Sequence, residues 1–240
     1  MKTGFIQTQV VALALLCSVG TSGEVPGGAG APAVNSSSAG AVEVRAKAPS
    51  RQAAAVKSPS TGVVQVLVAY DSLTGNTEQM ARSVIAGVKQ VEGAAAVLKK
   101  VSEVSKQDLE AADGIVLGCP TYYGNIPGRM KVVIDDWSWR MKVDFTDKAG
   151  GAFATGGGQV GGKEYVVVSL LMFMLNNRMV VAGPLYQNEK TGSVWAEAGA
   201  AAMTGPLDPG VSQSELDGAA RLGKRIALLA RKLKARDGAK

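Results

Sequence analysis

Hydroxyl, amide and glycine residues gather in one short segment, which reads Ser72-x-Thr74-Gly75-Asn76-Thr77. An apolar, β-branched run at residues 63–69 precedes it, as expected of a buried strand, and a helical pattern at residues 78–92 follows. Backbone N–H groups and the positive helix end face an anion at such a loop, and hydroxyls add donors. The sequence signatures of nucleotide P-loops and of dinucleotide-binding loops are both missing here. The segment therefore predicts a site for one phosphate monoester, with an ordinary helix-capping turn as the alternative.

Two further segments carry residues suited to a planar ligand. Tyr122 and Tyr123 offer flat rings that can stack on a heterocycle, and the backbone of Gly124 and Asn125 can approach a ring edge. Residues 156–162 read GGGQVGG, and a chain so rich in glycine allows close backbone contact with a ligand. Each segment alone also fits a surface turn. A phosphate, a planar ring and backbone donors together describe FMN.

The elements that must position these loops follow from the hydrophobic pattern. Strands are predicted at residues 63–69, 94–101, 114–118, 150–155 and 179–182. Helices are predicted at residues 78–92, 129–139 and 163–177, a turn or short helix at 108–112, and a last helix after the capping box of Ser212 and Glu215. The segment from 186 to 209 is expected to be long and irregular. Alternating strands and helices predict a doubly wound parallel α/β sheet, so the three loops should meet beyond the carboxyl ends of its strands.

The first sixty residues differ from the rest of the chain. Residues 1–23 resemble a signal-type leader, with a single basic residue near the start and an apolar run ending at Cys17. Residues 24–62 are rich in Ala, Gly, Ser and Pro, and we expect a disordered linker or an organelle presequence. The folded domain is expected at residues 63–237. The leader predicts targeting to the secretory pathway or to an organelle.

Charge is unevenly distributed along the chain, whose net charge is +6. Residues 63–220 carry thirteen basic and seventeen acidic residues, whereas residues 221–240 carry eight basic and one acidic residue. The basic last helix is either a solvated face or a contact for an anionic partner, and without interleaved aromatic residues no nucleic-acid binding is predicted. The chain has no His, so no metal site is predicted. Cys119 is expected to be a small core residue rather than a reactive thiol.

The loop sequences also resemble those of a known family. YDSLTGNTEQMA, from residue 70, looks like the phosphate loop of flavodoxins. CPTYYGNIPGRMK, from residue 119, resembles the second loop of flavodoxin-like NAD(P)H:quinone oxidoreductases of the WrbA type, and the glycine-rich third loop is similar too. The resemblance covers about residues 63–234 and none of the leader. It implies a five-stranded parallel sheet of order 2-1-3-4-5 with helices on both faces.

Residue roles are carried over from that resemblance by position. The residues implied to hold the FMN phosphate are Ser72, Thr74, Gly75, Asn76 and Thr77. Those implied to line the isoalloxazine are Pro120, Thr121, Tyr122, Tyr123, Gly124 and Asn125. Those implied to close its other side are Thr155, Gly156, Gly157, Gly158, Gly161 and Gly162.

The chain departs from the family at one place. Where the family often has a His pair before Gly-Met-Val, this chain has Asn176, Asn177 and Arg178. These three are candidate residues on the substrate side of the flavin, although Asn cannot supply a proton at neutral pH. Arg178 is hypothesised to stabilise an anionic reduced ring or a nicotinamide phosphate. No residue is assigned a catalytic role with certainty.

The resemblance implies an FMN-dependent oxidoreductase. Hydride would pass from NAD(P)H to FMN, and two electrons would pass on to a quinone. A flavodoxin-like one-electron carrier and an exported, non-redox module of the same fold are the alternatives. The uniformly apolar segment 165–175 indicates a homo-oligomer, either dimer or tetramer. A membrane contact is expected only through an uncleaved leader, which would anchor the domain in a compartment that contains NAD(P)H.

Overall fold

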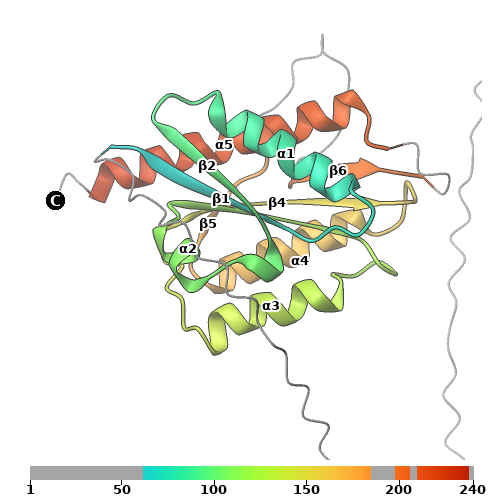
Figure 1. The fold of residues 1–240 in the computed structure, drawn as a ribbon, viewed down its shortest axis with the longest axis horizontal. Coiled ribbons are helices and arrows are strands. Elements are labelled where there is room, and N and C mark those ends of the chain that lie inside the picture. Colours follow the sequence, from blue (N-terminus) through green and yellow to red (C-terminus); the bar gives the residue numbers. More distant parts are fainter. Residues whose placement is uncertain (1–61, 185–197, 206–209, 238–240) are drawn as a thin grey trace, which may run out of the picture. The chain divides into compact units, whose positions relative to one another are not determined.

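The computed structural model describes residues 62–184, 198–205 and 210–237 (Figure 1). The signal-type leader, the linker up to residue 61 and most of the 186–209 segment lie outside the described residues. Within the described ranges, no helix has the length and apolarity needed to span a bilayer.

A parallel sheet forms the centre of the domain. Its strands are β1 (Val64–Tyr70), β2 (Ala94–Lys100), β3 (Gly114–Pro120), β4 (Ala149–Gly156), β5 (Val180–Val181) and β6 (Ala200–Met203). The order is β2-β1-β3-β4-β5, every pair is parallel, and β6 also pairs with β4. The predicted doubly wound sheet and its strand order are confirmed.

The strand that follows β4 in the sheet consists of two pieces, which corrects the sequence prediction. One strand was expected at residues 179–182, but only Val180 and Val181 pair, opposite Ala149 and Gly150 at the start of β4. β6 lies inside the 186–209 segment that was expected to be irregular. It pairs with residues 153–156 at the end of β4. Residues 200–202 are all Ala, so this strand carries no β-branched pattern that sequence reading detects.

Helices cover both faces of the sheet. They are α1 (Asn76–Lys89), α2 (Lys106–Ala111), α3 (Gly128–Trp139), α4 (Lys163–Asn176) and α5 (Gln213–Asp237), with a short 3₁₀ helix at Val101–Glu103. One hydrophobic cluster packs α1 and α5 on one face, and a second packs α2, α3 and α4 on the other. The predicted capping box is confirmed, because Ser212 N donates to Glu215 Oε2 over 2.9 Å and Glu215 N donates to Ser212 Oγ over 3.4 Å.

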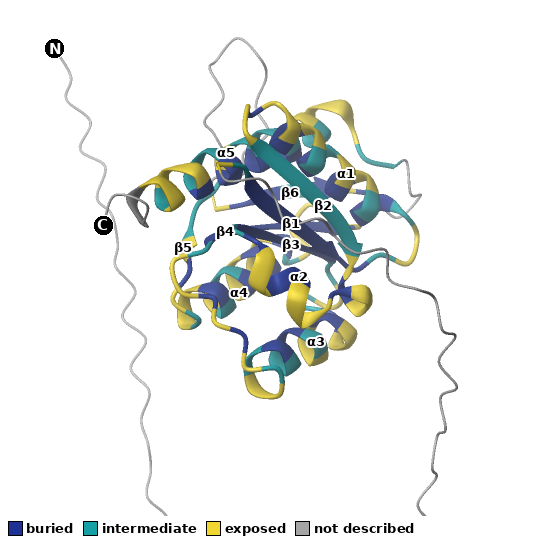
Figure 2. Ribbon diagram, turned by 60° about the vertical axis from the view of Figure 1, so that its left-hand side comes forward, coloured by how far each residue is buried: buried dark blue, intermediate teal, exposed yellow. Residues whose placement is uncertain are grey.

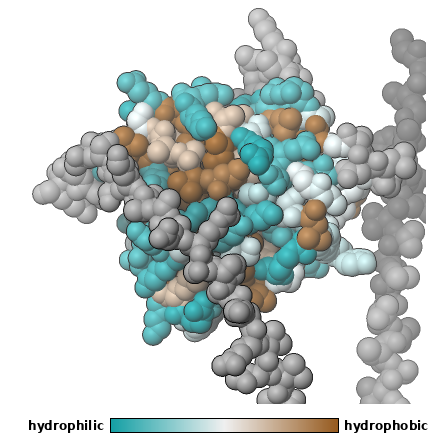
Figure 3. All heavy atoms as spheres, viewed as in Figure 1, coloured by the Kyte–Doolittle hydropathy of each residue, from teal (hydrophilic) through white to brown (hydrophobic). Residues whose placement is uncertain are grey.

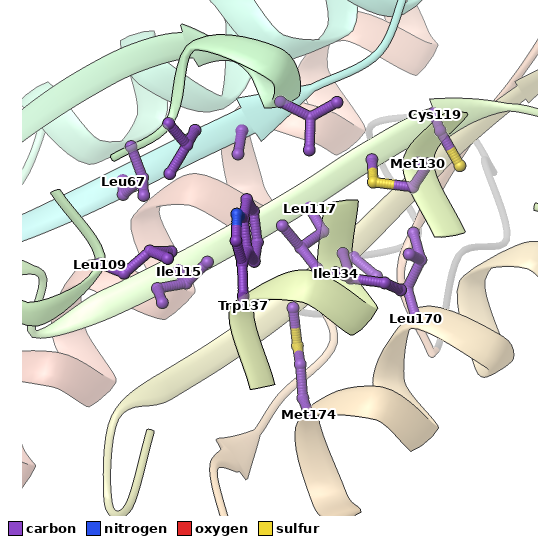
Figure 4. Packing of buried hydrophobic residues seen from close by; sticks show 14 of the residues in the cluster. Leu67, Leu109, Ile115, Leu117, Cys119, Met130, Ile134, Trp137, Leu170 and Met174 are labelled. Atoms are coloured by element: carbon purple, nitrogen blue, oxygen red, sulfur yellow. The ribbon is translucent and has the colours of Figure 1, made fainter. Parts of the chain in front are cut away.

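The core between the sheet and its helices is apolar. Trp137 of α3, Leu117 of β3 and Met174 of α4 are fully buried and lie together under the sheet (Figure 4). Cys119 belongs to the same cluster, as expected of a core residue. β1 and β4 are buried throughout and β3 is buried up to Cys119, whereas the outer faces of the helices are exposed (Figure 2). On the face drawn in Figure 3, hydrophobic residues form separate patches among hydrophilic ones. The buried strands thus hold the ends that carry the loops in fixed positions.

Candidate functional site

Loop one, residues 72–77, turns from β1 into α1. Gly75 N donates to Ser72 Oγ over 3.1 Å, which closes the turn while the Ser72 hydroxyl keeps its own O–H to donate. Gly75 adopts φ +99°, a conformation that favours glycine, and α1 begins at the next residue. The first N–H groups of a helix have no carbonyl partner within that helix. Loop one therefore presents backbone and hydroxyl donors at a helix N-terminus, as an anion requires.

Loop two, residues 120–125, follows β3 and forms a tight turn. Tyr122 N donates to Asn125 O over 3.1 Å, and Asn125 N donates to Tyr122 O over 3.0 Å. Tyr123 and Gly124 at the apex both adopt positive φ angles, of 50° and 75°. The two tyrosines differ in exposure, because Tyr122 is 39% exposed and Tyr123 is fully exposed. The predicted stacking residues thus lie on one ordered turn in two different environments.

Loop three, residues 155–162, joins β4 to α4 and is held by a residue that the sequence analysis did not select. Lys163, the first residue of α4, is buried, and its Nζ donates to Gly158 O over 2.6 Å and to Gln159 O over 3.2 Å. A cation at a helix N-terminus interacts unfavourably with the helix dipole. This unusual position at the start of a predicted helix is the one sequence signal that points to Lys163. Lys163 fixes a glycine segment that would otherwise have great conformational freedom.

The three loops contact one another at the carboxyl edge of the sheet. The Oγ1 atoms of Thr77 and Thr155 form a buried hydrogen bond of 2.8 Å, which joins loop one to loop three. Thr121 N donates to Thr155 O over 2.7 Å, which joins loop two to loop three. A Cβ added to Gly162 would lie 2.7 Å from the Cα of Gly124, so these glycines pack backbone against backbone. The predicted convergence of the loops is confirmed.

The residues present fit a flavin mononucleotide. The hydroxyl oxygen of Thr121 is buried and has no partner among the described residues, so it is available to a ligand. A Cβ added to Gly75 or Gly124 would meet no atom within 4 Å, which leaves room beside both glycines. The helix N-terminus of loop one suits a phosphate, while loops two and three suit a planar ring.

Two further residues beside the loops were missed by the sequence analysis. Asp71 follows β1 directly, and its Oδ1 accepts a hydrogen bond of 2.5 Å from Arg129 Nε. Hydrogen bonds to Asp71 and Tyr122 raise the pKa of the Arg129 guanidinium, which stays charged. Burial raises the pKa of the neighbouring Cys119 thiol well above its usual range, so this thiol stays protonated. The Asp71–Arg129 pair is thus the fixed charge pair beside loops one and two.

The end of β6 also reaches the site. Thr204 N donates to Gly156 O over 2.9 Å, and a Cβ added to Gly157 would lie 3.7 Å from Gly205 O. These contacts continue the pairing of β6 with β4 into loop three. The Ala-rich segment therefore supports one side of the site.

Asn176, Asn177 and Arg178, the candidate residues on the substrate side of the flavin, lie at the opposite edge of the sheet, so a single chain does not bring them next to the three loops. α4 runs back from the carboxyl edge, and these residues follow its far end. Asn177 Oδ1 accepts from Ser138 Oγ over 3.1 Å, and Arg178 Nε donates to Thr146 Oγ1 over 2.8 Å. Asn177 thus contacts the end of α3, and Arg178 contacts the segment that leads into β4, so neither contacts the three loops.

Comparisons with known proteins agree with this arrangement. The sequence profile of the family described as NADPH-dependent FMN reductase matches residues 87–191. A flavodoxin of Aquifex aeolicus is 34% identical over 163 residues, which cover 68% of this chain and 85% of that protein. An NAD(P)H dehydrogenase (quinone) of Geobacter metallireducens is 33% identical over 205 residues, which cover 71% of this chain and all of that protein. A protein of the same name from Syntrophobacter fumaroxidans is 32% identical, with 71% and 98% covered.

Solved structures show the same fold. A WrbA-like flavodoxin from Agrobacterium tumefaciens has a TM-score of 0.53 at 24% identity, with 70% of this chain and 98% of that chain covered. An archaeal flavodoxin has a TM-score of 0.55 at 21% identity, with 71% and 99% covered. The structures establish the flavodoxin fold, and the sequence relatives establish the family. The chain belongs to the flavodoxin-like family of WrbA-type NAD(P)H:quinone oxidoreductases.

Proposed function

We propose that the protein is an FMN-dependent oxidoreductase that transfers a hydride from NAD(P)H to FMN and two electrons on to a quinone. In the balanced reaction, NAD(P)H, a proton and the quinone give NAD(P)⁺ and the quinol. The observation that carries the proposal is the contact of three ligand-type loops at one sheet edge through Thr77, Thr121 and Thr155. Relatives at 32–33% identity that carry the name NAD(P)H dehydrogenase (quinone) support the reaction.

The chain's own residues would bind and orient the cofactor. Bound FMN supplies the redox chemistry, since it exchanges two electrons with nicotinamide and quinone. The α1 N-terminus and the hydroxyls of loop one would hold the phosphate, and Thr121 and the glycine backbones would contact the ring. The hydride and one proton together convert the quinone to the quinol, and the chain contains no His to supply that proton.

Anaerobic stopped-flow mixing of the FMN-loaded protein with NADH and with NADPH tests the proposal. We expect flavin absorbance to fall with at least one nucleotide and to return when a quinone is added. Absorbance that falls with neither nucleotide would contradict the enzyme. A reductive titration with two separate one-electron steps would favour the electron carrier, and protein that takes up no FMN would favour the non-redox module.

We also propose that the chain forms a homo-oligomer through α4. Tyr165, Val168, Met172 and Leu175 recur at helical spacing, and each is between 47% and 77% exposed. Contiguous exposed apolar surface of this kind is typical of protein interfaces. A second copy would bury the same stripe on both subunits.

The leader is the basis of a separate proposal on localisation. From its sequence pattern we propose that residues 1–23 direct the chain to the secretory pathway or an organelle, or anchor it to a membrane if uncleaved. Because the proposed reaction needs NAD(P)H, the domain would lie in a compartment that contains it. Cell fractionation of the tagged protein, followed by N-terminal sequencing, tests this proposal. Protein that keeps its leader and is found in the cytosolic fraction would contradict it.

A further inference from the structure

Three side chains form a connected group beside loops one and two. The Arg129 guanidinium near the start of α3 contacts the Asp71 carboxylate at the end of β1. On its other side, Arg129 Nη2 donates to Tyr122 Oη over 3.3 Å, and the guanidinium carbon lies 5.4 Å from the centroid of the Tyr122 ring. Arg129 thus joins the base of loop one to the aromatic ring of loop two.

Burial of Asp71 makes this arginine a rigid anchor. The Asp71 side chain is only 9% exposed, and its second carboxylate oxygen has no partner among the described residues. Arg129 is the one cation in an ion pair with this carboxylate within the described ranges. A buried carboxylate without its counterion is strongly unfavourable, so the guanidinium is held in place. Tyr122 therefore packs against a fixed partner rather than a mobile surface side chain.

The side chains of the two neighbouring tyrosines differ in what holds them. Tyr122 is held by two backbone hydrogen bonds to Asn125 and by Arg129. Tyr123 is fully exposed with φ +50°, and within the part of the chain that is described its side chain makes no hydrogen bond or ring contact. Loop two thus presents one ring that is already oriented and one that is free to adapt.

We infer that Asp71 and Arg129 are positioning residues that hold the Tyr122 ring in the orientation needed by the isoalloxazine before FMN arrives. The inference rests on the proposed function, because it needs FMN at the three loops. A ring ordered in advance does not lose its rotational freedom on binding, so binding is tighter. Tyr123, in contrast, becomes ordered only when the ligand is present.

A double-mutant cycle on FMN binding tests this inference. The dissociation constant and association rate of FMN are measured by flavin fluorescence on the full-length apoprotein and on Arg129→Gln, Tyr122→Leu and the double variant. We expect Arg129→Gln to weaken binding about tenfold, mainly through slower association, and the double variant to bind like Tyr122→Leu. Unchanged binding in Arg129→Gln, or effects that multiply in the double variant, would overturn the inference.

Further variants separate positioning from folding and from charge. Asp71→Asn combined with Arg129→Gln removes both charges, so no unpaired carboxylate remains buried, and we expect the same loss of affinity with unchanged far-UV circular dichroism. Arg129→Lys keeps the charge but lacks the planar fork that reaches Tyr122, and we expect binding to stay weak. Recovery of wild-type affinity in Arg129→Lys would show that charge alone suffices and would overturn the inference.

Tyr123→Leu is the matched control on the same turn. Its effect on FMN affinity should multiply with that of Arg129→Gln, because Tyr123 is not held by the arginine. Before FMN is added, the near-UV circular dichroism of tyrosine should fall in Arg129→Gln and remain in Tyr123→Leu. Wild-type protein that binds no FMN would contradict the proposed function itself, whereas FMN binding without the Arg129–Tyr122 coupling would contradict only the positioning role.

Discussion

Single side chains tie the three loops to the sheet. The Thr77–Thr155 hydrogen bond is buried and links residues that are 78 positions apart in the sequence. Both residues were predicted from the sequence as ligands of FMN, but no sequence pattern predicts a hydrogen bond between them. Through this hydrogen bond, Thr77 and Thr155 hold loop one against loop three.

Removal of this hydrogen bond should loosen the site without unfolding the domain. Thr77→Val replaces the hydroxyl with a methyl group of similar size and leaves the Thr155 hydroxyl buried and unpaired. We expect FMN affinity to fall about fivefold, since a buried hydrogen bond contributes about 1 kcal/mol and its loss displaces loop one. Thr146→Val, at the opposite edge of the sheet, is the control and should leave FMN affinity unchanged in the same fluorescence titration. Equal affinity for Thr77→Val and wild type would contradict the role of this bond.

Asp108 gives the folded domain a dependence on pH. Burial pushes the pKa of its carboxyl up, but hydrogen bonds from Lys99 Nζ, at 2.6 Å, and from Ser105 lower the pKa below its ordinary value. Because the pKa is about 3.9 in an unfolded chain and lower in the folded one, this carboxylate stabilises the fold above about pH 4. The stabilisation is lost as the pH falls through the folded-state pKa.

Asp108→Asn should therefore cost about 1–3 kcal/mol of unfolding free energy at pH 7 and progressively less toward pH 3. Asp135→Asn, which removes an exposed partner of Lys131 four residues away on α3, is the control and should cost less than about 0.5 kcal/mol. Urea unfolding of the three proteins across this pH range measures the differences. A cost of Asp108→Asn that does not vary with pH would contradict the assignment.

Contacts between residues that are far apart in the chain could not be predicted from the sequence. Asp71 and Arg129 are 58 positions apart, and no spacing rule connects them. The location of Asn176, Asn177 and Arg178 was open to deduction, because a helix that returns from a strand's carboxyl end must finish at the other edge.

At the scale of elements, β-branched runs and helical periodicity predicted most of the fold. β1 and β3 are short apolar strands, as expected, and α5 presents Leu222 and Ile226 to the core. β6 escaped prediction because three consecutive alanines fit helix, strand or loop equally well in isolation. It forms because β4 is eight residues long and β5 pairs with only its first two residues. Sheet pairing, rather than local propensity, determines this strand.

Close packing of α1 on α5 is the element contact that depends most on residue size. A Cβ on Gly87 of α1 would lie 1.7 Å from Ala220 O, and a Cβ on Gly223 of α5 would lie 2.0 Å from Val84 O. The two helices therefore meet backbone to backbone, and neither glycine can gain a methyl group unless the helices move apart.

Gly87→Ala should lower the free energy of unfolding by about 1–3 kcal/mol, although Ala is the better helix former. Gly128→Ala is the matched control, because a Cβ there meets no atom within 4 Å. The control should be neutral or stabilising by up to about 1 kcal/mol. Chemical denaturation monitored by circular dichroism measures both, and equal stability of the two variants would contradict the close helix contact.

At the scale of the whole molecule, the doubly wound sheet brings loops one, two and three and residues 204–205 after β6 together at one edge. Helices on both faces bury the strands, so the carboxyl ends of β1, β3 and β4 are fixed next to one another. The opposite edge has its own polar contacts, including Lys234 Nζ with Asp113 at 3.0 Å. The fold thus has one sheet edge that is suited to binding a ligand and an opposite edge where ion pairs join neighbouring elements.

The exposed apolar stripe of α4 is the proposed interface between copies of the chain. Met172→Glu places a charge in the middle of the proposed interface between copies, so we expect it to shift the protein from oligomer to monomer. Gln159→Glu, which adds the same charge on exposed loop three, is the control and should leave the oligomer intact. Light scattering after size-exclusion chromatography measures the mass. A wild-type protein that stays monomeric at high micromolar concentration would contradict self-association through α4.

Three loops at one sheet edge are expected to bind a singly phosphorylated flavin. A fluorescence titration of the apoprotein with FMN, and in parallel with riboflavin, tests this binding most directly. We predict one FMN per chain, with quenched flavin fluorescence and an affinity roughly a hundredfold higher than for riboflavin, because the α1 N-terminus and the loop-one hydroxyls bind the phosphate. Unquenched fluorescence at micromolar concentrations, or equal affinity for the two flavins, would contradict the account.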